Sequence, residues 1–98
     1  MNEDRWRAFT WREKMGHIAS EMSRAKHWEE RGDAESRARA LERALGMIDV
    51  TLQCYRDARR REISRLRELT AHCLTNSKAY DVSLDDLEHY ALSHIGMA

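Results

Sequence analysis

The chain has 98 residues, with no proline, four glycines and charged side chains at 35% of its positions. A chain of this length makes one domain (residues 1–98), and its arginine- and glutamate-rich composition excludes a sheet protein and predicts an all-α, compact helical bundle. The 17 basic and 17 acidic side chains cancel, so the overall charge does not indicate nucleic acid or an anionic membrane as a partner.

A first helix is predicted from about residue 4 to residue 31, because apolar side chains recur there at steps of three and four residues. These side chains are Ala8, Trp11, Met15, Ile18, Met22 and Ala25. Gly32 can take the left-handed conformation that ends a helix, and Asp33 can cap the next helix. A capping box of Thr10 with Glu13 is the alternative start, and it would leave the preceding residues in an arm.

The second helix is predicted over residues 33–55, where apolar residues follow a heptad pattern over three repeats. The apolar positions are Ala34, Ala38, Leu41, Leu45, Ile48, Leu52 and Tyr55. Because the linker before this helix has only one or two residues, the first two helices must turn back on each other. They are expected to form an antiparallel hairpin about 35 Å long, at ~1.5 Å per residue.

A third helix is predicted over residues 58–74, after a change in the register of the apolar positions. Continuing the heptad pattern would bury Arg59 and Glu62. The apolar or small side chains that follow are instead Ile63, Leu66, Leu69, Thr70 and Cys73. We place the break between residues 55 and 58, with Asp57 as a helix cap; a continuous, kinked helix is the alternative.

A short fourth helix is predicted over residues 83–95. Ser83 and Asp86 have the spacing of a capping box at its start, and Gly96 can end it. The side chains expected to face inward are Leu84, Leu87, Tyr90 and Ala91. The expected fold is therefore a long antiparallel helical hairpin plus two shorter helices.

The stretch RELTAH contains an arginine, Arg67, and a histidine, His72, separated by four residues. This Arg-x4-His pattern in a small helical protein resembles the signature of the HEPN ribonucleases. The resemblance implies a dimer whose shared cleft uses Arg67 to stabilise phosphate and His72 to assist proton transfer. Residues five apart lie about 140° apart around a helix, so one helix cannot bring both side chains to one phosphate. A HEPN-like ribonuclease or toxin is thus an alternative function, and no catalytic residue is favoured.

An arginine run, RDARRRE, begins the third predicted helix. Its Arg59, Arg60 and Arg61 could contact the phosphates of RNA or DNA, so an accessory nucleic-acid-binding module is a second alternative. Residues 56–67 hold six arginines and two acidic residues, whereas residues 81–98 hold four acidic residues and no Lys or Arg. The favoured interpretation is that these two segments face each other, within the chain or between chains.

The residues able to bind a metal do not have the spacing of a metal site. They are Cys54, His72, Cys73, His89 and His94. Zinc sites on helices or knuckles use histidines four residues apart or close cysteine pairs, so we predict no metal and no cofactor. The sequence shows neither an export signal nor an apolar segment of ~20 residues. The cysteines are therefore expected to be reduced thiols in a cytoplasmic protein.

Trp6 and Phe9 lie off the apolar stripe of the first helix, and the hairpin is expected to leave both uncovered. Large exposed aromatic side chains usually mark a contact, most often with another copy of the chain. The alternative is that the third or fourth helix folds over them. The function favoured by the sequence is a protein-binding or adaptor bundle that self-associates through Trp6 and Phe9, and this interpretation is favoured over an enzyme.

Overall fold

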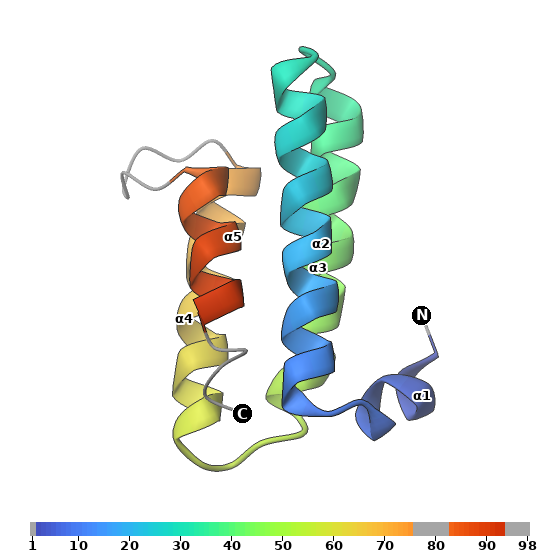
Figure 1. Cartoon of the computed structure of the whole chain (residues 1–98), viewed down its shortest axis with the longest axis vertical. Coiled ribbons are helices and arrows are strands. Elements are labelled where there is room, and N and C mark those ends of the chain that lie inside the picture. The colour runs from blue at the N-terminus through green and yellow to red at the C-terminus, as the bar shows by residue number, and fades with distance from the viewer. Residues whose placement is uncertain (1, 76–82, 94–98) are drawn as a thin grey trace.

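The computed structural model describes residues 2–75 and 83–93, and its regular secondary structure there is entirely α-helical. The five helices are α1 (Glu3–Ala8), α2 (Trp11–Glu30), α3 (Ala34–Leu52), α4 (Ala58–Leu74) and α5 (Leu84–Ser93). α2 and α3 run antiparallel, α5 packs on α2, and α4 packs on α3 (Figure 1). α1 lies at the open end of the hairpin, on the side away from α4 and α5. The prediction of an all-α bundle built on a long antiparallel hairpin is confirmed.

The turn between α2 and α3 forms as its residues predict. Gly32 has a φ of +74°, a left-handed conformation that glycine adopts without steric strain. Asp33 caps α3, because its carboxylate accepts hydrogen bonds from the backbone N–H of Ser36 at 3.0 Å and from the Ser36 hydroxyl at 2.8 Å. These bonds lower the pKa of Asp33. Three residues close together in the sequence therefore define this end of the hairpin.

The structure divides the first predicted helix into α1 and α2. The Thr10 hydroxyl accepts from the Glu13 backbone N–H at 3.1 Å, and the Glu13 carboxylate accepts from the Thr10 backbone N–H at 2.8 Å. Of the two starts considered for this helix, the capping box is the one observed, and it lets the chain change direction at Phe9 and Thr10. From Trp11 onward the predicted stripe is buried, whereas Ala8 is exposed.

The buried face of α3 differs from the predicted heptad seam. Leu41 and Ile48 are fully buried as predicted, but Leu45 is only half-buried and Ala34 is exposed. The other buried residues of α3 are Ala40, Ala44, Val50 and Thr51. The reason is that α3 contacts α1, α2 and α4. A helix with neighbours on several sides buries a wider arc than the narrow stripe of a two-helix seam.

α4 begins after a break in the chain direction, as predicted. Asp57 caps it by accepting a hydrogen bond from the backbone N–H of Arg59 at 3.0 Å. All five positions predicted to face the core are buried: Ile63, Leu66, Leu69, Thr70 and Cys73. The predicted capping box of Ser83 and Asp86 precedes α5, while the predicted end of this helix at Gly96 lies outside the described residues.

Two side-chain contacts fix α5 against its neighbours. The Tyr90 hydroxyl donates to Glu62 Oε2 of α4 at 2.5 Å, and burial together with this hydrogen bond raises the pKa of Tyr90. Lys26 of α2 pairs with Asp85 at 2.5 Å. The sequence predicted that residues 56–67 and 81–98 face each other, and the bond between Glu62 and Tyr90 joins these two segments. The acidic first turn of α5, however, meets a lysine of α2.

Candidate protein interface

Arg67 and His72 lie in the second half of α4 with different surroundings. Arg67 Nε donates to Asp49 Oδ1 of α3 at 2.6 Å, and both side chains are about half exposed. His72 is half-buried, more than one turn further along the helix. The structure thus gives Arg67 an interhelical ion pair inside one chain. A ribonuclease site at these two residues stays a prediction from the sequence.

The arginine run makes contacts that close the turn between α3 and α4. The Arg59 guanidinium donates to both carboxylate oxygens of Asp57 and lies 4.5 Å from the centre of the Tyr55 ring. The Arg59 hydrogen bonds lower the pKa of Asp57. Arg60 Nη1 donates to the carbonyl of Leu52, and Arg61 is exposed. Two of the three arginines therefore make contacts within the chain, and a nucleic-acid site at this run stays a prediction from the sequence.

The described residues include no group of three or more His, Cys, Asp and Glu side chains placed to hold a metal ion. Cys54 donates its thiol hydrogen to the carbonyl of Val50 at 3.3 Å, as expected for a structural thiol in a helix end. Cys73 is buried, and burial raises its pKa. His94, another candidate ligand, lies outside the described part of the chain. In residues 2–75 and 83–93, no helix has the length and apolarity required to cross a lipid bilayer.

Trp6 is buried at the open end of the hairpin, with 3% of its surface exposed. Its indole Nε1 donates to Thr51 Oγ1 of α3 at 2.9 Å, across 45 residues of sequence. The expectation that the hairpin leaves Trp6 uncovered is therefore wrong: α1 folds back onto α3 and supplies the burial itself. Thr51 lies off the predicted heptad seam, so nothing in the sequence indicated this bond.

A buried lysine, Lys14, holds the end of α1 in place. Its side-chain ammonium donates to the carbonyl of Phe9 at 2.8 Å, to the carbonyl of Arg7 at 3.4 Å and to the Tyr55 hydroxyl at 3.1 Å. Only 2% of Lys14 is exposed. Buried charges require such hydrogen bonds. Sequence reasoning missed Lys14 because lysines on a helix are usually solvated.

Phe9, Trp6, His17 and Met47 form a cluster that we call the aromatic corner. Phe9 and His17 pack with ring centres 4.9 Å apart, and Trp6 meets Phe9 edge to face at 5.8 Å. Phe9 and Met47 are half-buried and His17 is exposed. A hollow of about 280 Å³ lies beside these side chains, with Asn2 and Arg5 on its rim. The corner therefore offers aromatic and thioether surface next to a recess, the combination found at protein contact points.

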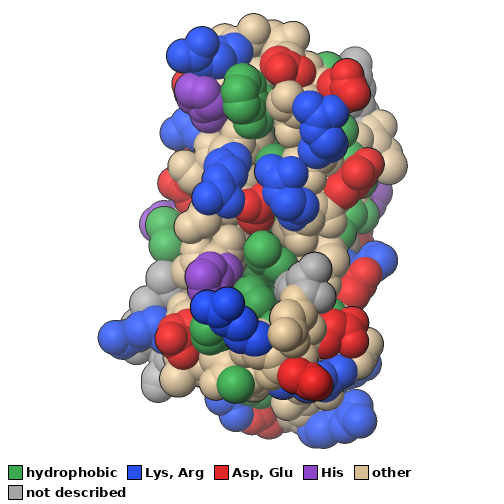
Figure 2. All heavy atoms as spheres, turned by 90° about the vertical axis from the view of Figure 1, so that its right-hand side faces the viewer, with side chains coloured by type: hydrophobic (Ala, Val, Ile, Leu, Met, Phe, Trp, Pro, Cys, Tyr) green, Lys and Arg blue, Asp and Glu red, His purple; other side chains and the backbone are tan. Residues whose placement is uncertain are grey.

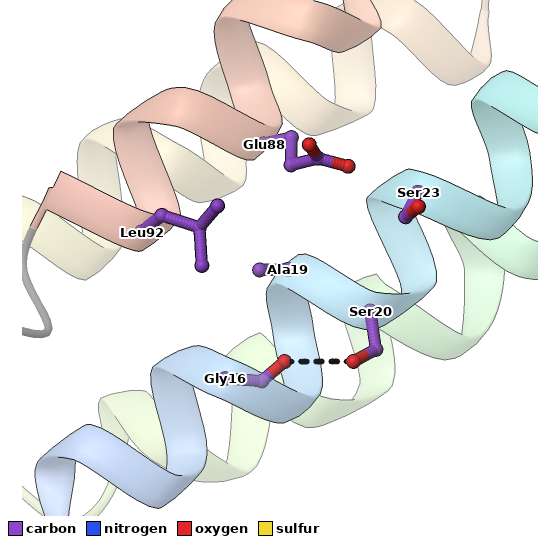
Figure 3. Close-up of a pocket in the computed structure, with 6 residues that line it drawn as sticks. All are labelled: Gly16, Ala19, Ser20, Ser23, Glu88 and Leu92. Carbon is purple, nitrogen blue, oxygen red and sulfur yellow. Dashed lines mark hydrogen bonds between the residues drawn. The ribbon is translucent and has the colours of Figure 1, made fainter.

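A second hollow, of about 240 Å³, lies between α2 and α5. It is lined by small and polar residues and one leucine: Gly16, Ala19, Ser20, Ser23, Glu88 and Leu92 (Figure 3). The Ser20 hydroxyl donates to the carbonyl of Gly16 at 3.0 Å, and is thereby turned along its own helix. Leu92 extends from α5 toward α2 and is 44% exposed, the largest exposure of a large apolar side chain among the described residues. This groove has less aromatic surface than the corner.

The face of the molecule that includes α1 carries basic and acidic side chains in alternation, with apolar groups between them (Figure 2). It therefore lacks the single-sign surface expected for a nucleic-acid site.

Comparison of the chain with protein-family models, with curated proteins and with solved structures finds no match in any of the three.

Proposed function

We propose that this protein acts by binding protein, and that the aromatic corner is where it associates with a second copy of itself. The observation that carries this proposal is the packing of Phe9 against His17 beside a hollow of about 280 Å³. Aromatic side chains next to a recess are typical anchors of protein interfaces.

A second copy is the partner to which the corner is complementary. In a two-fold symmetric dimer the same patch faces itself, so it must offer both a projecting group and a recess. Phe9 and the adjacent hollow supply these two shapes. The charges are also of both signs: Arg5 lies on the rim of the hollow, and Glu13 lies close to His17. Thr10 lowers the pKa of Glu13 by hydrogen bonding, and His17 lowers it further. Arg5 of one copy can then face a carboxylate of the other.

Within this proposal Trp6 and Phe9 have different roles. Trp6 is held by Thr51 and is covered by its own chain, so it anchors α1 and not the partner. Phe9 follows directly after α1 and keeps part of its ring accessible. The interface predicted at both residues is therefore narrowed to Phe9, with His17 and Met47 added from α2 and α3.

Sedimentation velocity of the full chain tests the proposal. At a protein concentration of roughly tens of micromolar, the wild type should sediment as a species heavier than its 11.5 kDa monomer. Phe9→Ala should weaken the dimer by about ten-fold or more, as truncation of an interface anchor does. Leu92→Ala is the matched control in the other hollow and should leave the dimer unchanged. A wild type that stays monomeric, or a dimer lost only in Leu92→Ala, would contradict the assignment of the corner.

A further inference from the structure

Glu21 is a charged residue in the interior of the hairpin, with 2% of its surface exposed. Each of its carboxylate oxygens accepts a hydrogen bond from a different arginine. Arg24 Nη1, from the same helix, binds Oε1, and Arg43 Nε, from α3, binds Oε2 at 2.6 Å. Glu21 therefore holds two guanidinium groups next to each other on the outer surface of α2 and α3.

The two arginines exceed what the burial of one carboxylate requires. A single guanidinium would neutralise Glu21, whereas the pair leaves a net charge of +1 on the cluster. The side chains of Arg24 and Arg43 are 61% and 50% exposed. Each donates one hydrogen bond to Glu21, and a guanidinium has five N–H donors, so both arginines keep donors for a further acceptor.

We propose that Arg24 and Arg43 form a binding site for one oxyanion, a phosphate- or carboxylate-type group with a single negative charge. Adjacent oxygens of such a group are spaced like the two oxygens of Glu21, so the anion can bridge the two guanidiniums from outside as Glu21 does from inside. Paired N–H donors of arginine fit this geometry and make short, charge-assisted hydrogen bonds. One negative charge also balances the net charge of the cluster.

Glu21 acts in this site as a positioning residue. It does not touch the anion, but its two bonds fix both guanidiniums in one arrangement, which reduces the side-chain entropy that binding would otherwise remove. Arg39 provides an internal comparison. It lies one turn before Arg43 on α3, but its carboxylate partner at 2.8 Å is the exposed Glu35.

The test is a titration of the full chain with sodium phosphate, followed by NMR signals of the arginine Nε–H groups. Sodium chloride at equal ionic strength is the reference, and sodium acetate is a parallel arm. We expect saturable shifts at Arg24 and Arg43 and no comparable shift at Arg39. Response to phosphate alone defines a tetrahedral ligand, and response to acetate as well extends the site to carboxylates. Shifts that match the chloride reference, or that are equal at Arg39, would overturn the proposal.

Three variants sharpen the test, each checked for a native melting transition. Arg24→Gln and Arg43→Gln should each weaken phosphate binding by about five-fold or more, because each removes one of the two guanidiniums that bind the anion. Arg39→Gln should change the phosphate affinity by less than about two-fold, since Arg39 is not part of the proposed site. If Arg43→Gln does not fold, Arg43→Lys, which keeps the charge and loses the paired donors, takes its place. Equal weakening in all variants would indicate general surface charge and would reject a defined site. The measurement does not depend on dimer formation, so it is separable from the proposed function.

Discussion

The two ends of the α2–α3 hairpin are built by different means. At the turn end, Gly32 and Asp33 fix the chain through contacts with residues at most a few positions away. At the open end, Trp6 binds Thr51 across 45 residues, and Arg7 binds Gln53 across 46 at 2.6 Å. Local chemistry thus sets where the hairpin turns, while contacts between distant residues set how α1 covers its other end. Local features of this kind can be predicted from a sequence, whereas contacts between distant residues cannot.

The largest effect on stability is expected in the middle of the hairpin, because both of its ends depend on the core there. Ile48 is fully buried on α3, so Ile48→Ala should lower the free energy of unfolding by ~2 to 5 kcal/mol through lost burial and a cavity. Leu45→Ala, at a half-buried position of the predicted heptad seam, should cost clearly less. Urea unfolding of both variants measures the difference. Equal losses would show that Leu45 contributes as much to the core as Ile48, against the half-buried position that the structure gives it.

A smaller effect is expected at the open end from Thr51→Val. The change keeps the shape of the side chain but leaves the buried indole N–H of Trp6 without its acceptor, which should cost ~1 to 3 kcal/mol. Thr70→Val is the matched control, because Thr70 is also fully buried and its hydroxyl donates to the carbonyl four residues before it. In Thr70→Val no indole depends on the hydroxyl, so the loss should be smaller. The same urea measurement decides, and a greater loss at Thr70 would refute the role given to the Trp6 bond.

Two glycine substitutions, one at the turn and one inside α3, should change the stability in opposite directions. Gly32→Ala places a Cβ on a left-handed residue and should cost ~1 kcal/mol. Gly46→Ala, inside α3, puts a Cβ where no atom lies within 4 Å, and should stabilise the protein by ~0.5 to 1 kcal/mol through helix propensity. Melting temperatures give both signs. Stabilisation by Gly32→Ala would mean that the turn does not need its left-handed residue.

The smallest effects are expected at Arg67 and His72. Arg67 forms an exposed ion pair with Asp49, so Arg67→Ala should lower the free energy of unfolding by less than ~1 kcal/mol.

We expect purified wild type to leave transfer RNA intact in metal-free buffer, because Arg67 is engaged with α3 and His72 lies on another flank of α4. Gel analysis of the RNA is the measurement. Cleavage by the wild type that is lost in His72→Ala would establish these residues as an active site.

The sequence predicted the features that neighbouring residues encode. The stripe from Trp11 to Ala25, the Asp33 and Asp57 caps and the left-handed Gly32 all follow from spacing or from one residue's chemistry, and the structure has each of them. The break before α4 followed from the change of register after residue 55 in the same way.

The candidate sites were less predictable because they depend on tertiary contacts. The heptad spacing of apolar residues predicted a narrow buried seam on α3, but the contacts of α3 with three other helices bury a different face. Trp6 was expected on the surface because nothing near it in sequence covers it. Lys14 and Glu21 are buried charges whose partners come from other segments, so spacing along one helix could not reveal them.

The tight turn at Gly32 also bears on the order in which the chain can fold. Helices joined by so short a connection meet through contacts of low sequence separation, which form quickly. The hairpin and both halves of the Trp6 to Thr51 bond lie within the first 52 residues, and they leave the ribosome before α4 and α5 do. During synthesis, α2 and α3 can therefore pair first and serve as the template on which the C-terminal helices dock.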